Sequence, residues 1–373
     1  MKVILYIGHH KVGSTALQSY LSQSWLPLAR AGVLYPSIDG EGFAANLASL
    51  LGKPIQDPDA IFIREPHSAL AYRMIHEATP QLPIPPQFAG LPAAPQMLRS
   101  LRKQVEALAP HTLLLCSEAF ANFGNIAKGQ IAQLRDFCNS LADHVEFEIY
   151  CALRRPDAYL ASWHGQRLKV GEPATSLATD WEAQYLHTVH FNYRLVIEEW
   201  MRQIPDARLH LRKYRDITKA GGSIKDFTSQ TGLPLPDGLC PSLRANTSLP
   251  LASFPLMEQA LQDLPGDQRH QLTKYLLTHG KALAPVANKD IELFGARQRA
   301  KLFKAFTPVE RYLRSQTGQP EFFRDLETLT TPRPIPVESA GQDLVRALAN
   351  RVSHSSFATP ALADYIHKRA GAI

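Results

Sequence analysis

Four short apolar runs alternate with segments of helical periodicity along the first two thirds of the chain. The apolar runs are at residues 3–7, 113–116, 145–153 and 207–214. Apolar residues recur at helical spacing between and after them, at 14–29, 98–107, 130–141, 156–168, 192–202 and 223–231. Because a crossover helix returns the chain to the same edge of a sheet, this alternation favours parallel strands with helices on both faces. We therefore expect an α/β fold.

The pattern changes at about residue 253, after which helical segments follow one another without strands between them. These segments are at 254–261, 269–278, 291–305, 308–316 and 341–352. We expect two domains, an α/β domain at 1–250 and a helical C-terminal cap at 251–373. Within the first domain, the Pro-rich stretch 53–97 is interpreted as an irregular insertion that contains a short helix at 68–77 and acts as a substrate lid.

The composition is that of an ordinary globular protein, with 373 residues, 45% hydrophobic and 20% charged. A net charge of +6 suits an anionic ligand. Lys and Arg are spread along the chain, however, so neither nucleic acid nor a membrane surface is indicated as a partner. No apolar stretch is long enough to span a bilayer. The chain enters a strand directly after Met1 and Lys2, which leaves no room for a signal peptide, and we expect a cytoplasmic protein.

The four cysteines give no sign of a metal centre or a disulfide framework. Cys116, Cys138, Cys151 and Cys240 form no C-x-x-C pair and no metal-ligand spacing with the histidines. Cys116 and Cys151 lie inside apolar runs, where a thiol behaves as a small buried hydrophobe. A reduced compartment and a site that requires no metal ion are therefore expected.

The loop after the first predicted strand carries the main functional signal. Residues 8–15 read G-H-H-K-V-G-S-T and connect the strand to a helix, which is the setting of a phosphate-binding loop. The spacing of Gly8 and Gly13 is that of a nucleoside-triphosphate P-loop. In that motif a lysine follows the second glycine directly, whereas here Ser14 stands there and Lys11 comes two residues before Gly13.

A second motif follows the third predicted strand. Arg154 ends the strand, and Ser162 lies eight residues later on the following helix, which begins at Pro156. A guanidinium group offers a planar fork to a phosphate, and a serine hydroxyl adds a further donor. Arg155 is the alternative ligand, or a solvated neighbour of the true one.

These two motifs resemble those of the sulfotransferases that use 3′-phosphoadenosine-5′-phosphosulfate (PAPS), in particular bacterial enzymes of the carbohydrate-sulfotransferase type. The resemblance is tight over residues 3–21 and 147–165 and loose elsewhere up to about residue 250. It implies a P-loop-type parallel sheet flanked by helices, with PAPS as co-substrate, adenosine 3′,5′-bisphosphate as product and no required metal.

The resemblance also implies residue roles. Lys11 is expected to contact the bridging oxygen as the sulfuryl group leaves, and Arg154 and Ser162 to hold the 3′-phosphate. Arg244, in an R-x-N-x-S segment, is a weaker ligand candidate, and the late R-K-G signature of the cytosolic enzymes does not occur. The residues expected to surround the 5′-phosphate are His9, Lys11, Val12, Gly13, Ser14 and Thr15.

The acceptor's proton needs a base, and two candidates remain open. Glu118 follows the second predicted strand and would share an edge of the sheet with the loop, and related carbohydrate sulfotransferases use a glutamate. His10 is next to Lys11 and can accept a proton near neutral pH. A purely structural role for Glu118, as a helix cap or an ion-pair partner, fits the sequence equally well.

We therefore expect an enzyme that transfers a sulfuryl group from PAPS to a hydroxyl, or less readily an amine, of a carbohydrate-like or small-molecule acceptor. Two alternatives remain. One is a P-loop kinase or NTPase in which Glu118 is the acidic metal-binding residue, although the position of Lys11 argues against it. The other is a non-catalytic nucleotide-binding protein on the same scaffold. The sequence leaves the oligomeric state open.

Overall fold

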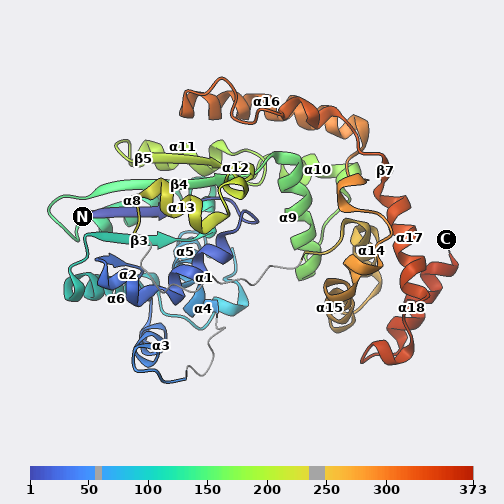
Figure 1. Ribbon diagram of the computed structural model, residues 1–373, viewed down its shortest axis with the longest axis horizontal. Coiled ribbons are helices and arrows are strands. Elements are labelled where there is room, and N and C mark those ends of the chain that lie inside the picture. Colours follow the sequence, from blue (N-terminus) through green and yellow to red (C-terminus); the bar gives the residue numbers. More distant parts are fainter. Residues whose placement is uncertain (55–60, 235–247, 373) are drawn as a thin grey trace. The chain divides into compact units, whose positions relative to one another are not determined.

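A five-stranded parallel sheet forms the centre of the first part of the protein (Figure 1). The structure is a computed structural model and describes residues 1–54, 61–234 and 248–372. The strand order is β2-β3-β1-β4-β5. The strands are β1 (Lys2–Tyr6), β2 (Val33–Leu34), β3 (Thr112–Cys116), β4 (Glu146–Leu153) and β5 (Arg208–Lys213). The expected parallel α/β sheet is confirmed, and the two-residue edge strand β2 is an addition to it.

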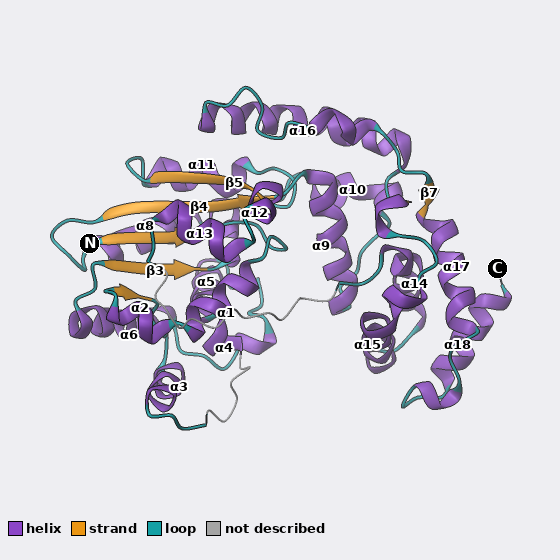
Figure 2. Cartoon of the chain, in the orientation of Figure 1, coloured by secondary structure: helices purple, strands orange, loops and turns teal. Residues whose placement is uncertain are grey.

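The central strand β1 is apolar on both sides because both faces of the sheet are covered. Ile4 and Tyr6 point into one hydrophobic cluster, which also contains Leu17 of α1 and Phe227 of α13. Residues alternate between the faces of a strand, so Leu5 points to the opposite side, where it is also buried. Figure 2 shows helices on both sides of the strands. A continuous apolar run is what such a doubly covered strand requires.

The helices of this part match the predicted periodicity with small shifts. The expected helix at 14–29 divides at Ser24, and the stretch 53–97 is more regular than expected, because it contains α4, α5 and the start of α6. Its role as a lid stays a prediction. The helices are α1 (Ser14–Gln23), α2 (Trp25–Arg30), α3 (Gly40–Leu50), α4 (Ile61–Arg64), α5 (Pro66–Ala78), α6 (Ala94–Leu108), α7 (Phe123–Ile126), α8 (Lys128–Asn139), α11 (Arg194–Gln203), α12 (Tyr214–Lys219) and α13 (Ser223–Thr231).

The chain divides into two compact units whose boundaries differ from a single cut at residue 250. Unit 1 consists of Met1–Arg154, Asn192–Ala245 and Gln316–Gly318, and unit 2 of Arg155–Phe191, Asn246–Ser315 and Gln319–Ile373. The sequence placed residues 155–191 with the α/β domain, whereas here they group with the C-terminal helices.

Unit 2 is helical apart from a small parallel pair of strands, β6 (Ile291–Glu292) and β7 (Ile335–Pro336). The two helices expected at 291–305 and 308–316 are instead one helix, α16, with Pro308 inside it. The helices are α9 (Pro156–Val170), α10 (Leu177–Tyr185), α14 (Phe254–Asp263), α15 (Gly266–Leu283), α16 (Gly295–Thr317), α17 (Val337–Ala349) and α18 (Ala361–Gly371).

The described residues also bear on the cysteines and on membrane-spanning helices. Cys116 and Cys151 are buried in the sheet and Cys138 in α8, so these thiols serve as small apolar side chains. Of the helices in the described ranges, none is both long and apolar enough to cross a bilayer.

One close contact fixes how α7 packs against α11. A β-carbon at Gly124 would lie 2.2 Å from the carbonyl oxygen of Leu195, far inside the van der Waals distance. A β-carbon at Gly129, one turn further on in α8, would meet no described atom within 4 Å.

Gly124→Ala is therefore expected to lower the free energy of unfolding by about 2–3 kcal/mol, because α7 must move away from α11. Gly129→Ala is the matched control and is expected to change stability by less than about 1 kcal/mol, in the stabilising direction. Urea unfolding followed by circular dichroism measures both. Equal effects of the two substitutions would show that the contact at Gly124 does not limit the packing.

Candidate functional site

The loops that leave β1, β3 and β4 meet at the carboxyl edge of the sheet. β1 pairs in parallel with both β3 and β4, so Tyr6 is level with Cys116 on one side and with Tyr150 on the other. The predicted phosphate-binding loop, Glu118 and Arg154 follow these three strands. Segments that are more than 100 residues apart in sequence thus share one edge.

The loop Gly8–Gly13 begins as a continuation of β1. The amide of His9 donates a hydrogen bond to the carbonyl of Ala152 on β4, at 3.0 Å. A β-carbon at Gly8 would lie 2.7 Å from the amide nitrogen of Ala152, so only glycine fits there. The loop then turns through positive φ angles at Lys11 (61°) and Gly13 (89°). Between them the side chain of Val12 is buried in the core and anchors the turn.

A residue 210 positions further along the chain holds the end of the loop. The hydroxyl of Ser223, the first residue of α13, donates to the carbonyl of Gly13 at 2.9 Å. A β-carbon at Gly13 would lie 3.1 Å from the same hydroxyl oxygen, so the glycine permits this close approach as well as the left-handed backbone. The sequence analysis assigned Ser223 only to a helix start.

The N-terminus of α1 follows directly. Gly13 occupies the N-cap position, and among the described residues no side chain caps the first turn of this helix. The first amides of a helix carry partial positive charge and bind anions. Ser14 is buried and Thr15 partly exposed at this end. This local geometry is suited to an anionic group.

Glu118 is bound from three sides by the loop and by α1. Its Oε2 accepts a hydrogen bond from Nε2 of Gln18 at 2.6 Å, and its Oε1 lies 3.6 Å from Nδ1 of His10. The hydroxyl of Ser14 donates to it as well. Burial alone would raise the pKa of Glu118, but the contact with His10, its own backbone amide and the hydroxyl of Ser14 hold the pKa below its ordinary value. Glu118 is therefore a charged carboxylate that ties the loop to β3.

A second carboxyl group lies near Glu118. Glu65, at the start of α5, is 7% exposed and accepts a hydrogen bond from Arg64. Burial and the charge of Glu118 raise the pKa of Glu65 to about 7. The neighbouring Ser68 donates to Oε1 of Gln18 at 3.2 Å. Neither Glu65 nor Gln18 stands in a motif, so the sequence analysis missed both.

Two tyrosines contact Arg154, and one of them also contacts the loop. Its guanidinium lies over the ring of Tyr214, 5.2 Å from the centroid, and its carbonyl accepts a hydrogen bond from the hydroxyl of Tyr193 at 2.6 Å. The ring of Tyr193 in turn contacts the ring of His9 edge-on at 4.3 Å. Tyr193 is a buried residue of unit 1, and it also joins the two motifs.

The structure separates Arg155 from Arg154. Arg155 forms two hydrogen bonds with Asp157, at 2.8 and 2.9 Å, and an ion pair with Asp325, all within unit 2. Burial alone would lower the pKa of Arg155, but the charge of Asp157 outweighs it and the pKa is raised. Arg155 thus has a structural role in unit 2.

Two of the predicted residues fall outside the described part of unit 1. Ser162 is a partly exposed residue of α9 and belongs to unit 2, whereas the loop, Glu118 and Arg154 belong to unit 1. Arg244 lies outside the described residues. His9, His10, Lys11, Val12, Gly13, Ser14 and Thr15 are together in one unit with Glu118 and Arg154.

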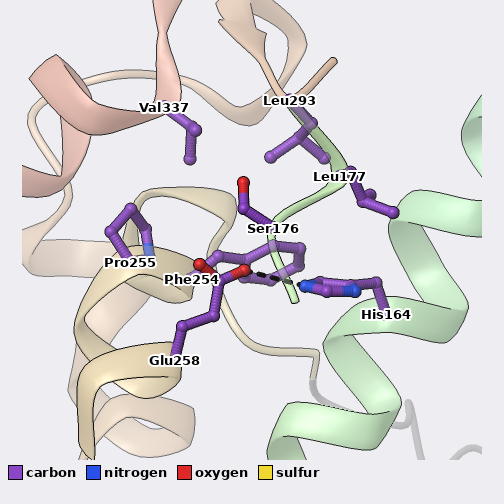
Figure 3. A pocket seen from close by; sticks show the side chains of 8 residues that line it. All are labelled: His164, Ser176, Leu177, Phe254, Pro255, Glu258, Leu293 and Val337. Carbon is purple, nitrogen blue, oxygen red and sulfur yellow. Dashed lines mark hydrogen bonds and ion pairs between the residues drawn. The ribbon is translucent and has the colours of Figure 1, made fainter. Parts of the chain in front are cut away.

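A different polar cluster lies within unit 2, at a small pocket (Figure 3). His164 of α9 is fully buried, and its Nε2 lies 2.9 Å from Oε1 of Glu258 on α14. Its Nδ1 is 3.2 Å from the hydroxyl of Tyr185. Because both ring nitrogens have partners and the rest of the lining is mostly apolar, this cluster serves to join α9 to α14.

Comparisons of the chain with protein-family models, with curated proteins and with solved structures find no match. The chemistry of the site therefore has to be inferred from its own residues. The site combines backbone amides, a helix N-terminus, Lys11 and Arg154, which suit an anionic ligand. It also contains His10 and Glu118, which can accept a proton.

The raised pKa of Glu65 predicts how stability depends on pH. The unfolded chain loses this proton near 4.5 and the folded protein near 7. Between these values the folded state binds more protons, so stability falls as the pH rises. Glu65→Gln removes this loss and is expected to stabilise the protein at about pH 8 by up to about 3 kcal/mol, with little effect near pH 4.5.

Urea unfolding at the two pH values measures this difference. Glu106→Gln is the control, because Glu106 is exposed and pairs with Lys103 along the surface of α6. If Glu65→Gln leaves the pH dependence as it is in the wild type, Glu65 does not carry the buried proton.

Proposed function

We propose that the protein is a PAPS-dependent sulfotransferase, which transfers a sulfuryl group from PAPS to a hydroxyl of a carbohydrate-like or small-molecule acceptor. One observation carries this proposal. The loop with the displaced lysine and the strand that ends in Arg154 are 140 residues apart in sequence, yet β1 and β4 are hydrogen-bonded neighbours. Tyr193 further joins the two motifs through His9 and the carbonyl of Arg154.

PAPS carries two anionic ends, and the residues of unit 1 suit both. The 5′-phosphosulfate would contact the amides of the Gly8–Gly13 loop and the first turn of α1, with Lys11 donating to the bridging oxygen. Charge accumulates on that oxygen as the sulfuryl group leaves, so an ammonium donor there stabilises the transition state more than the ground state. Arg154 would hold the 3′-phosphate through its planar guanidinium. A P-loop-type arrangement of the sheet is part of the same proposal.

The environment of Glu118 favours sulfuryl transfer over the kinase or NTPase alternative. The acidic residue after the second long strand of a P-loop enzyme assists in holding Mg²⁺. Here one oxygen of Glu118 accepts a hydrogen bond from Gln18 and the other faces His10. Both oxygens are therefore directed at side chains of the protein.

A thermal-shift titration tests the donor. Adenosine 3′,5′-bisphosphate at a hundredfold excess over Kd is expected to stabilise the wild type by about 2.7 kcal/mol, and ATP with Mg²⁺ by much less. Lys11→Ala is expected to lose most of this shift, while Lys103→Ala, which removes an exposed lysine of α6, retains it. A larger shift from ATP with Mg²⁺ would favour the kinase alternative, and the absence of any shift from the bisphosphate would overturn the proposal.

Arg154→Ala tests the 3′-phosphate contact. We expect this variant to bind PAPS about 10- to 100-fold more weakly, because charged hydrogen bonds contribute about 1.5–3 kcal/mol. Binding of adenosine 5′-phosphosulfate, which lacks the 3′-phosphate, should change little. Arg102→Ala is the matched control, since Arg102 also lies over an aromatic ring, that of Phe137, but on α6. Isothermal titration calorimetry measures the affinities, and an equal loss for both nucleotides would remove Arg154 from the 3′-phosphate site.

A further inference from the structure

The contacts of Glu118 are those of a residue that positions other groups. Its Oε2 is 2.6 Å from the Nε2 donor of Gln18, and Ser14 donates to the same carboxylate. Its side chain is only 13% exposed. Uptake of a proton from a substrate would make Glu118 a weaker acceptor for the hydrogen bonds from Gln18 and Ser14 that hold α1. Its lowered pKa also makes it a weaker base than an ordinary carboxylate.

His10 is the loop residue that lies against Glu118. Its Nδ1 is 3.6 Å from Oε1 of Glu118, and it is followed in the chain by Lys11. The side chain is 15% exposed, slightly more than that of its partner. A carboxylate at Nδ1 selects the tautomer with the proton on that nitrogen, and Nε2 then carries the lone pair. Such contacts are often long without substrate and shorten in the complex.

We propose that His10 takes the proton from the acceptor and that Glu118 is the positioning residue that orients its imidazole. The proposal rests on the proposed function and names the base for that reaction. The acceptor oxygen bonds to sulfur while the bond between sulfur and the bridging oxygen of PAPS breaks. That electron pair leaves on adenosine 3′,5′-bisphosphate. The acceptor proton passes to Nε2 of His10, and Glu118 stabilises the imidazolium through Nδ1–H before the proton is released to solvent.

Gln18 and Ser68 make this arrangement rigid. Gln18 donates to Glu118, and its own Oε1 accepts from the hydroxyl of Ser68 at 3.2 Å. The hydroxyl of Ser68 also lies 2.9 Å from that of Ser117, the residue before Glu118. The carboxylate is therefore fixed by α1 and α5, and the imidazole on the loop is held against a stationary group. A proton acceptor has to be held in one orientation by its neighbours, and these contacts do so for His10.

Chemical rescue distinguishes the two possible bases. The assay follows release of adenosine 3′,5′-bisphosphate from PAPS with water or N-acetylglucosamine as acceptor. His10→Ala is expected to slow release by about 100-fold or more. Added imidazole is expected to raise the rate of this variant about tenfold. Glu118→Ala is expected to lose activity that formate does not restore. If formate restores Glu118→Ala and imidazole does not restore His10→Ala, then Glu118 is the base and the proposal is wrong.

His144 and Glu146 provide a matched control. They form a histidine–carboxylate pair at 3.4 Å, but both side chains are more than 70% exposed and they lie at the opposite end of β4. His144→Ala is expected to leave release unchanged. A loss equal to that of His10→Ala would show that the effect on the loop is not specific.

A measurement on the protein alone keeps the proposal testable without an acceptor. In ¹⁵N-histidine-labelled protein, His10 is expected to carry its proton on Nδ1 near neutral pH, and Glu118→Gln to abolish this preference while the other histidine signals stay in place. A neutral His10 protonated on Nε2 would overturn the proposal. If the bisphosphate fails to stabilise the wild type, the proposed function fails, and the base assignment with it. If it binds but the wild type releases none from PAPS, the result favours the non-catalytic alternative. If the wild type releases it and His10→Ala does so at the same rate, only the base assignment is overturned.

Discussion

The pairing of β1 with both β3 and β4 is the constraint on which the rest of the site depends. Each neighbour delivers one loop to the same edge, so the Gly8–Gly13 loop lies between Glu118 and Arg154. The register also lets the amide of His9 continue the ladder to Ala152. A shift of one residue in either pairing would turn Ile4 and Tyr6 out of the cluster that they share with Val12.

Two carboxyl groups lie close together at this edge. Glu65 is buried and the side chain of Glu118 is 13% exposed. Two negative charges this close together in a buried site are unfavourable, so the pKa values of the two glutamates shift in opposite directions. The pKa of Glu65 is raised and that of Glu118 is lowered. One carboxylate remains charged and orients His10, and the other keeps a proton up to about pH 7.

Much of the fold was predictable because strands buried on both faces are apolar throughout. Periodicity alone placed β1, β3, β4, β5 and most helices within a few residues, and it failed where tertiary packing decides. The helix α16 continues through Pro308, where the sequence predicted a break between two helices. Residues 155–191 group with the C-terminal helices. In the site, Lys11 and Arg154 stood in motifs. Gln18, Glu65 and Ser223 did not, because their roles arise only from contacts across the fold.

The hydrogen bond from Ser223 to Gly13 has a consequence for biosynthesis. The loop is synthesised before α13, and the hydroxyl that fixes its last peptide is made 210 residues later. Long-range contacts of this kind form late in folding. Until β5 and α13 have been synthesised and docked, the loop lacks one of its restraints, so a nascent chain of unit 1 does not hold the loop in its final form before this later segment is made.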